Sequence, residues 1–276
     1  MVTYYLHNSS YADAHVVILG VPDASGSRSL RARGVAQGSD YIRRISRKLD
    51  IFGKGRKVQS SEGVIRAKVY DRGNVNKKSL SKKITPIISD GKLPIIFGGD
   101  HSLSAEAMKG IATAGKDFVF VYFDAHPDYR CGAGKYYGSV LCDVAKLNVV
   151  DFARSSIVGM RAPEKVELQN LKKTKLLVIT PSMIEELGVK RVFEKLKKRI
   201  GRRPVYVSVD MDVVDPHVAP GVDTPVPGGL SASQLIYFMH KLGSLHLIGA
   251  DVVEVNPRYD IQHMTGHLAS RVVAEL

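Results

Sequence analysis

Short runs of β-branched and aromatic residues alternate with amphipathic helical stretches along the chain, and this alternation constrains the fold more than any other feature. Continuous apolar runs are typical of strands buried on both faces, and strands that alternate with helices form mainly parallel sheets. The pattern predicts an α/β fold, a three-layer sandwich in which helices cover both faces of a mainly parallel sheet of about eight strands. The expected strands are 16–19, 67–70, 94–97, 118–123, 156–159, 176–179, 205–209 and 247–253.

Between these strands the apolar residues change to helical spacing. The sets are Ile42, Ile45 and Leu49; Leu80, Ile84 and Ile87; Leu235, Met239 and Leu242; and Leu268, Val272 and Leu276. One helix is expected to begin near Ser231, whose hydroxyl can cap a free backbone N–H while Gln234 reaches back. No repeat, low-complexity segment or long linker divides the chain, so the sequence predicts one domain over 1–276.

The 40 Lys and Arg residues outnumber the 27 Asp and Glu residues and give a formal charge of +13, which raises the question of nucleic-acid binding. The basic residues form scattered stretches at 43–48, 77–83 and 195–199 without an aromatic-interleaved motif, so a solvated basic face is predicted instead. No apolar run approaches the roughly 20 residues that cross a bilayer, and a cytoplasmic protein without a membrane partner is expected.

Only two cysteines occur, Cys131 and Cys142, and they lie on a predicted loop that runs into a helix. No CxxC pair is present, so a structural zinc site is not expected. Because the two cysteines lie eleven positions apart on this stretch, a disulfide framework is not indicated either.

Histidine and aspartate concentrate where three of the predicted strands end. GGDHS (98–102), DAHPD (124–128) and DMDVVD (210–215) each follow directly on a strand. Because the carboxyl ends of parallel strands share one edge of a sheet, where ligands bind, the three clusters are expected to converge. Each motif alone is compatible with a tight turn or a helix cap, but three on one edge favour a metal site.

The clusters supply two imidazoles and four carboxylates without a thiolate, a ligand set that suits hard or borderline ions such as Mn²⁺. Four clustered carboxylates would repel one another unless cations neutralised them, and two divalent ions do so formally. The sequence therefore predicts two metal ions per chain. The predicted ligands are His101, Asp124, His126, Asp128, Asp210 and Asp212.

The remaining acidic and imidazole side chains have other expected roles. Asp100, Asp215 and Asp251 are candidates for turn formation or for support behind the ligands. The other histidines are expected to be ordinary surface or packing residues, and they are His7, His15, His240, His246, His263 and His267.

Together with segments 20–43, 215–230 and 254–257, these clusters give a sequence that resembles the ureohydrolases, the family of arginase, agmatinase, guanidinobutyrase and formimidoylglutamase. The resemblance covers nearly the whole chain and implies an arginase-like fold. It also implies two manganese sites that share Asp124 and Asp210 as bridging ligands. One site would add His101 and Asp128, and the other would add His126 and Asp212.

The resemblance further implies a metal-dependent hydrolysis of a C–N bond in a linear, cationic guanidine compound. Agmatine, which would give urea and putrescine as in polyamine biosynthesis, is the favoured substrate. Glu254 matches the carboxylate that clamps the guanidinium, Thr224 lies in the matching loop, and Asp128 would accept a hydrogen bond from the attacking nucleophile. The family also implies a homo-oligomer, a trimer or hexamer.

The loop after DAHPD departs from the family pattern, because the histidine thought to transfer a proton there aligns with Gly138. Either water, Tyr137 or a residue from another loop such as His217 takes that role, or the enzyme is slower, or the substrate differs. Tyr137 and Arg130 are expected to contact substrate, and Arg130 with Lys135 could bind a carboxylate, which keeps formimidoylglutamate and guanidinobutyrate open as substrates. Tyr129 and Tyr136 also differ from the short polar residues of arginases, which weakens arginase activity as an alternative.

Two further readings stay open from the sequence. Zinc deacetylases share a DxH motif and a later Asp, although the consecutive His-His pair usual in those enzymes is absent here. A non-catalytic metal-binding homologue, which lost the proton shuttle at Gly138, is the other.

Overall fold

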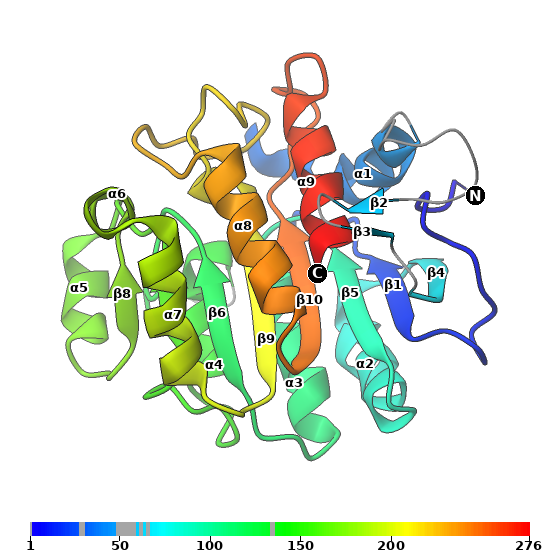
Figure 1. Ribbon diagram of the computed structural model, residues 1–276, viewed down its shortest axis with the longest axis horizontal. Coiled ribbons are helices and arrows are strands. Elements are labelled where there is room, and N and C mark those ends of the chain that lie inside the picture. The colour runs from blue at the N-terminus through cyan, green and yellow to red at the C-terminus, as the bar shows by residue number, and fades with distance from the viewer. Residues whose placement is uncertain (1, 28–30, 48–58, 61–62, 65–66, 133–135) are drawn as a thin grey trace.

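The computed structural model describes residues 2–27, 31–47, 59–60, 63–64, 67–132 and 136–276. Eight parallel strands form its main sheet, in the order β4-β1-β5-β10-β9-β6-β7-β8 (Figure 1). They match the predicted strands one for one. The strands are β1 (Val16–Gly20), β4 (Val69–Asn74), β5 (Leu93–Phe97), β6 (Val119–Phe123), β7 (Ser156–Val158), β8 (Leu177–Ile179), β9 (Val205–Asp210) and β10 (Leu247–Val253). A small antiparallel pair consists of β2 (Gln59–Ser60) and β3 (Gly63–Val64).

Helices cover both faces of the sheet, so the predicted three-layer arrangement is confirmed (Figure 1). One face packs against α1 (Gly38–Ser46), α6 (Pro181–Leu187), α7 (Val189–Ile200), α8 (Ala232–Gly243) and α9 (Met264–Glu275). The other face packs against α2 (Leu80–Ser89), α3 (Leu103–Thr113), α4 (Val140–Val144) and α5 (Lys165–Leu171). Four short 3₁₀ segments complete the described elements: η1 (Arg31–Gln37), η2 (Lys77–Ser79), η3 (Tyr137–Ser139) and η4 (Met211–Val213).

The burial of strand β6 on both faces explains why its sequence is apolar throughout. Val121 and Phe123 point into the core on one face, whereas Phe120 and Tyr122 point into the core on the other, and all four are completely buried. A strand covered on both faces has no solvent side on which polar residues are favoured.

The predicted capping box of α8 is present. Oγ of Ser231 accepts a hydrogen bond from the backbone N–H of Gln234 at 3.1 Å, and Oε1 of Gln234 accepts one from the backbone N–H of Ser231 at 2.9 Å. Two N–H groups that lack helical partners are thereby satisfied. In the predicted helix around Ile42 and Ile45, Leu49 lies outside the described residues.

Arg43 of α1 forms a buried ion pair that holds edge strand β4. Its Nε and Nη2 donate to the two carboxylate oxygens of Asp71 at 2.8 and 2.9 Å, and Nη1 donates to Oδ1 of Asn74 at 2.6 Å. The guanidinium also lies 5.5 Å from the ring centroid of Phe97. Because the side chain is only 1% exposed, every charged donor needs such a partner.

The sequence does not indicate a disulfide, but Cys131 and Cys142 form one. The bond joins the loop after β6 to α4. Cysteine count and spacing gave no signal for it, since the pairing depends on how the loop folds back onto α4.

Among the described residues, no helix is both long and apolar enough to span a bilayer.

The strand order determines where the predicted metal ligands lie. Strands β5, β10, β9 and β6 are consecutive neighbours near the middle of the sheet and run in parallel. Their carboxyl ends therefore lie side by side at one edge. The last residue of β9, Asp210, and the segments that follow these four strands carry all the predicted ligands together with Glu254.

Candidate metal centre

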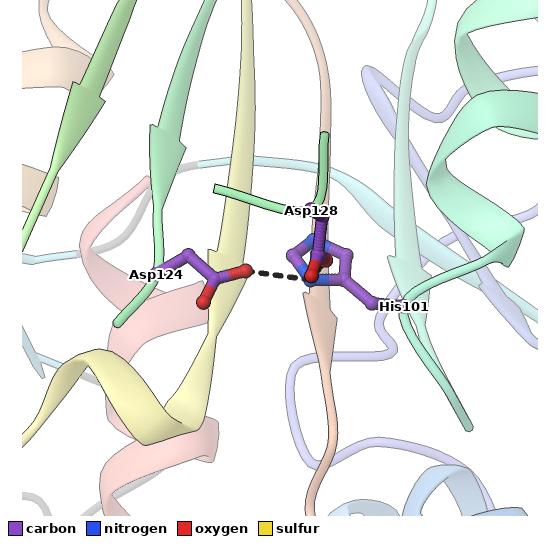
Figure 2. A group of neighbouring side chains, drawn as sticks. All are labelled: His101, Asp124 and Asp128. Atoms are coloured by element: carbon purple, nitrogen blue, oxygen red, sulfur yellow. Dashed lines mark ion pairs between the residues drawn. The ribbon is translucent and has the colours of Figure 1, made fainter. Parts of the chain in front are cut away.

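His101, which follows β5, lies at the centre of a group of three carboxylates. Its Nδ1 is 3.1 Å from Oδ2 of Asp124, 3.3 Å from Oδ2 of Asp128 and 3.1 Å from Oδ2 of Asp210. The side chains of His101, Asp124 and Asp128 point toward one another (Figure 2). A ring nitrogen and carboxylate oxygens that converge in this way form a candidate cation site.

His126 forms a second group beside the first. Its Nδ1 is 3.0 Å from Oδ2 of Asp212 and 3.5 Å from Oδ1 of Asp124. Asp124 thus faces both imidazoles through different oxygens. The structure brings all six predicted ligands together in two adjoining groups, with Asp124 between them.

A chain of hydrogen bonds orients the imidazole of His101 from behind. Nε2 of His101 lies 2.9 Å from Oγ of Ser208, and Ser208 donates its hydroxyl proton to Oδ1 of Asp251 at 2.7 Å. Tyr206 donates to the other oxygen of Asp251 at 2.6 Å. Because Ser208 has one proton and gives it to Asp251, Nε2 of His101 must supply the proton between them. Nδ1 is therefore the nitrogen directed at the carboxylates.

A stacked tyrosine holds the same ring from the side. Tyr122 lies parallel to His101 with ring centroids 4.5 Å apart, and its hydroxyl donates to Oδ2 of Asp128 at 2.7 Å. These contacts fix the ring plane and one carboxylate at once. Partners of this kind behind a ligand set both its tautomer and its direction.

The donor set fits a cation site. Oδ2 of Asp124 is buried and accepts no hydrogen bond, although Nδ1 of His101 is close to it. One Nδ1–H can serve only one of the three facing carboxylates, so several lone pairs in this buried group remain without a donor. Lone pairs that converge on one point are satisfied by a cation.

The pKa shifts have the same cause. Burial lowers the pKa of His101, but the facing carboxylates of Asp124, Asp128 and Asp210 outweigh it and raise the pKa well above its ordinary value. Burial together with the charges of Asp128 and Asp212 raises the pKa of Asp124 to about 6. Despite its burial, His126 has a pKa raised to about 12 by hydrogen bonds to Asp124 and Asp212. Without cations, the centre retains protons.

Two of the predicted site residues adopt the left-handed backbone conformation that side chains rarely take. The φ angle is 46° at Asp128 and 62° at Glu254. Such conformations cost on the order of 1–3 kcal/mol each and persist where the surroundings enforce them, often at functional sites. Asp124, His126 and Asp128 also do not continue the alternation of β6. The strand ends at Phe123, and a turn directs the side chains inward.

Glu254, placed by this strained backbone, borders a cavity of about 240 Å³ that opens above the two groups. Its Oε1 accepts a hydrogen bond from the backbone N–H of His101 at 2.8 Å. Burial, followed by the charges of Asp210 and Asp100, raises the pKa of Glu254 well above its ordinary value. Thr224 also borders the cavity, and its hydroxyl donates to Oδ2 of Asp212 at 3.1 Å.

The loop after β6 forms the outer wall of the cavity. Tyr136, Tyr137, Gly138 and Arg130 line it. Burial, then the charges of Asp223 and Glu254, raises the pKa of Tyr137, so its hydroxyl is a proton-bearing donor at neutral pH. A side chain at Gly138 would instead begin against the ring of Tyr136, 2.8 Å from the nearest ring atom. Tyr137 therefore lies close enough to Glu254 for that charge to act on its hydroxyl.

Other candidates from the sequence lie elsewhere. His217 is 77% exposed and binds Asp215 rather than lining the described cavity. Lys135 is outside the described residues. Asp100 and Asp215 form turns, as expected, because each accepts the backbone N–H two residues further on, that of Ser102 and that of His217, both at 3.1 Å.

Four residues near the centre were missed at the sequence level. Ser208 and Tyr206 support His101, Arg161 binds the carbonyl of Asp212, and Glu167 borders the cavity. Their only signal was weak. A hydroxyl group inside the otherwise apolar strand VYVSV marks Ser208, but nothing in the sequence distinguishes Arg161 from the other basic residues.

Comparison with known proteins gives a consistent result. The sequence profile of the arginase family matches residues 14–276. Proclavaminate amidinohydrolase from Streptomyces clavuligerus is 35% identical over 187 residues, which cover 66% of this chain and 60% of that protein. An agmatinase from Salmonella dublin is 30% identical over 275 residues, which cover 96% of this chain and 87% of that protein. The chain thus aligns with less than two thirds of the first relative and with most of the second.

Solved structures share the fold. The proclavaminate amidinohydrolase structure from Streptomyces clavuligerus superposes with a TM-score of 0.87 at 29% identity, covering 100% of this chain and 95% of that one.

Proposed function

The chain belongs to the arginase family, and on that premise we propose that it is a metal-dependent hydrolase of linear guanidine compounds, with agmatine as substrate and urea and putrescine as products. Two Mn²⁺ ions per chain are the proposed cofactors. His101, Asp124, Asp128 and Asp210 would hold one ion. His126, Asp124, Asp210 and Asp212 would hold the other.

One observation carries the proposal. Asp124 turns one oxygen toward His101 at 3.1 Å and the other toward His126 at 3.5 Å, inside a buried cluster of carboxylates. A carboxylate between two imidazole groups is the arrangement expected of a ligand that bridges two cations. The thiol-free ligand set favours manganese over softer ions.

When bound, the ions would supply a water activated for nucleophilic attack and positive charge for the reaction. The protein's own residues then hold the substrate. Glu254 lines the same cavity as the ligand groups and can bind the two N–H edges of a planar guanidinium with its two oxygens. Such a clamp aligns the guanidinium carbon for attack, and Asp128 can accept a proton or hydrogen bond from the nucleophile.

The outer part of the cavity favours a cationic substrate tail. Glu164 and Glu167 border it together with Arg130, whose Nη1 pairs with Glu164 at 3.2 Å. With Arg130 engaged in this way, the wall offers a carboxylate surplus rather than a free cation. This supports agmatine, which ends in an ammonium group, over guanidinobutyrate, formimidoylglutamate and arginine, which end in carboxylates.

The test is a substrate panel with the manganese-loaded protein. Urea release from agmatine, arginine and guanidinobutyrate is measured beside formamide release from formimidoylglutamate. We expect the highest kcat/KM with agmatine. A preference for guanidinobutyrate or formimidoylglutamate would overturn the choice of substrate but not the reaction class, whereas no turnover with any of the four would overturn both.

Two other functions would be indicated by separate measurements. Acetyl-polyamine cleavage with one zinc ion per chain would indicate a deacetylase. If the unmodified protein is inactive and only Gly138→His shows activity, the chain is a non-catalytic homologue. A cytoplasmic location, one domain over 1–276 and a trimeric or hexameric assembly stay predictions, and light scattering tests the assembly.

A further inference from the structure

Arg161, which follows β7 at the same edge of the sheet, directs its whole guanidinium at backbone carbonyl groups. Nη2 donates to the carbonyl of Asp212 at 2.8 Å, Nη1 to that of Val213 at 3.2 Å, and Nε to that of Pro227 at 3.2 Å. The remaining acceptors are the carbonyls of Gly159, Val214 and Val226. One side chain thus connects three separate segments of the chain.

Two of these segments carry residues of the candidate centre whose positions are not set by a strand end alone. Asp212 lies on η4, and Thr224 lies on the long loop before α8. The two side chains meet where Thr224 donates to Asp212. The same two segments are joined nearby by backbone hydrogen bonds, since the N–H of Asp215 donates to the carbonyl of Leu230 and the N–H of Leu230 donates to that of Val213, both at 3.0 Å.

The loop is shaped to admit the guanidinium. A Cβ added at Gly229 would lie 2.7 Å from Nη2 of Arg161 and 2.5 Å from the backbone nitrogen of Asp215. No ion pair between Arg161 and a carboxylate occurs among the described residues, so its charge is available to the surroundings. An arginine without a carboxylate partner, at a site rich in carboxylates, is not explained by charge pairing.

We propose that Arg161 is a positioning residue, whose guanidinium fixes η4 and the loop at Thr224 relative to each other and thereby sets the geometry of the metal site that includes His126 and Asp212. The inference rests on the proposed pair of metal ions. Arg161 contacts neither the proposed ligand atoms nor the substrate cavity directly, and it acts through the backbone of Asp212.

Charge and geometry have opposite effects here, which makes the proposal testable. A nearby positive charge repels a bound cation, so its removal strengthens metal binding. A planar guanidinium that fixes a ligand-bearing segment strengthens metal binding, so removal of the guanidinium weakens metal binding. Arg161→Lys keeps the charge but replaces the planar guanidinium with a single ammonium group. Arg161→Gln removes both.

The measurement is Mn²⁺ binding in competition with a chromophoric chelator, which resolves strong from weak sites. We expect both variants to lose about 10- to 100-fold in affinity at one of two binding steps, the range typical of residues that support a ligand. The other step should be unchanged. Tighter binding in Arg161→Gln with unchanged binding in Arg161→Lys would show that Arg161 acts through charge alone and overturn the proposal. Unchanged binding in both variants would overturn it too.

Arg199 provides a matched control. Its guanidinium also binds backbone carbonyls, those of Ser155 and Lys175, but these precede β7 and β8 at the opposite edge of the sheet. Arg199→Lys and Arg199→Gln should therefore bind Mn²⁺ like the unmodified protein. Equal losses in the Arg199 variants would attribute the effect to general destabilisation and overturn the specific role of Arg161.

A second readout does not depend on metal. In the metal-free protein, the amide protons of Asp215 and Leu230 should exchange faster in both Arg161 variants, because the two segments they join are no longer held by the guanidinium. Unchanged exchange would contradict the positioning role. If no form of the protein binds Mn²⁺, the proposed function fails, and the exchange rates still decide the role of Arg161.

Discussion

Oγ of Ser208 lies 2.9 Å from Nε2 of His101, on the side of the imidazole opposite Asp124. Because Ser208 gives its own proton to Asp251, this contact determines which nitrogen of His101 carries a proton and which is free to bind a cation. Ser208→Ala should therefore weaken Mn²⁺ binding by about 10-fold or more. In the metal-free protein, the ¹⁵N chemical shifts of the His101 ring should also change.

Ser156 is the matched control for that variant. Its hydroxyl is likewise buried in a strand, but the described structure gives it no hydrogen-bond partner. Ser156→Ala should leave both Mn²⁺ affinity and the His101 shifts as they are. Normal Mn²⁺ affinity in Ser208→Ala would contradict the orienting role of the serine.

Glu254→Gln separates charge from placement at the proposed clamp. The glutamine keeps an oxygen that can accept the N–H of His101, but it lacks the negative charge that binds a guanidinium. We expect kcat/KM for agmatine to fall by about 100-fold or more, a loss comparable to that of an essential charged contact. Mn²⁺ stoichiometry, measured by elemental analysis, should not change. A variant with normal kcat/KM would exclude Glu254 as the clamp.

The strands and strand-end clusters were predictable because they depend on local patterns. Apolar runs such as that of β6 identify buried strands, and parallel strands align their carboxyl ends, so the convergence of His101 with Asp124 follows from topology. The left-handed turns at Asp128 and Glu254 were not predictable. Neither residue type favours that conformation strongly, and the surrounding fold imposes it.

Contacts made by side chains distant in sequence were also beyond pattern analysis. Arg161 binds carbonyl groups about fifty to sixty-five positions away, and its residue type alone indicates only a basic surface. The same holds for the pairing of Cys131 with Cys142, because two cysteines give no signal of their distance in the fold.

The pKa shifts predict that the metal-free protein loses stability as the pH rises. Asp124 and Asp212 raise the pKa of His126 from 6.5 to about 12, so its contribution to stability is complete below pH 6.5 and is lost as the pH rises through about 12. The raised pKa of Asp124 acts in the same direction between 3.8 and about 6. The Tm of the metal-free protein should therefore be lower at about pH 9 than at about pH 6.

Saturating Mn²⁺ should reverse this trend, because cations compete with protons for the same ligands and bind more tightly at high pH. Differential scanning fluorimetry measures the Tm at each pH with and without Mn²⁺. A metal-free Tm that rises over this pH range would contradict the assignment of retained protons to the centre.

The disulfide should stabilise both the fold and the cavity wall. Cys131 and Cys142 are 11 positions apart, and closing a loop of that length stabilises a protein by about 3 kcal/mol in the chain-entropy account. Cys131→Ser with Cys142→Ser should lower the free energy of unfolding by up to about that amount. KM for agmatine should rise, since the bond anchors the segment that carries Tyr137. Treatment of the unmodified protein with a reductant should reproduce both effects, and a KM unaffected by either would separate the disulfide from substrate binding.

The central claim is that two ions, sharing Asp124, create a guanidine hydrolase. Its most direct test is to titrate Mn²⁺ into the metal-free protein and to measure bound ions per chain and urea release from agmatine in the same samples. We predict that urea release appears as the second ion binds and reaches its maximum at two ions per chain. Full activity at one ion per chain, or no urea at two, would contradict the account.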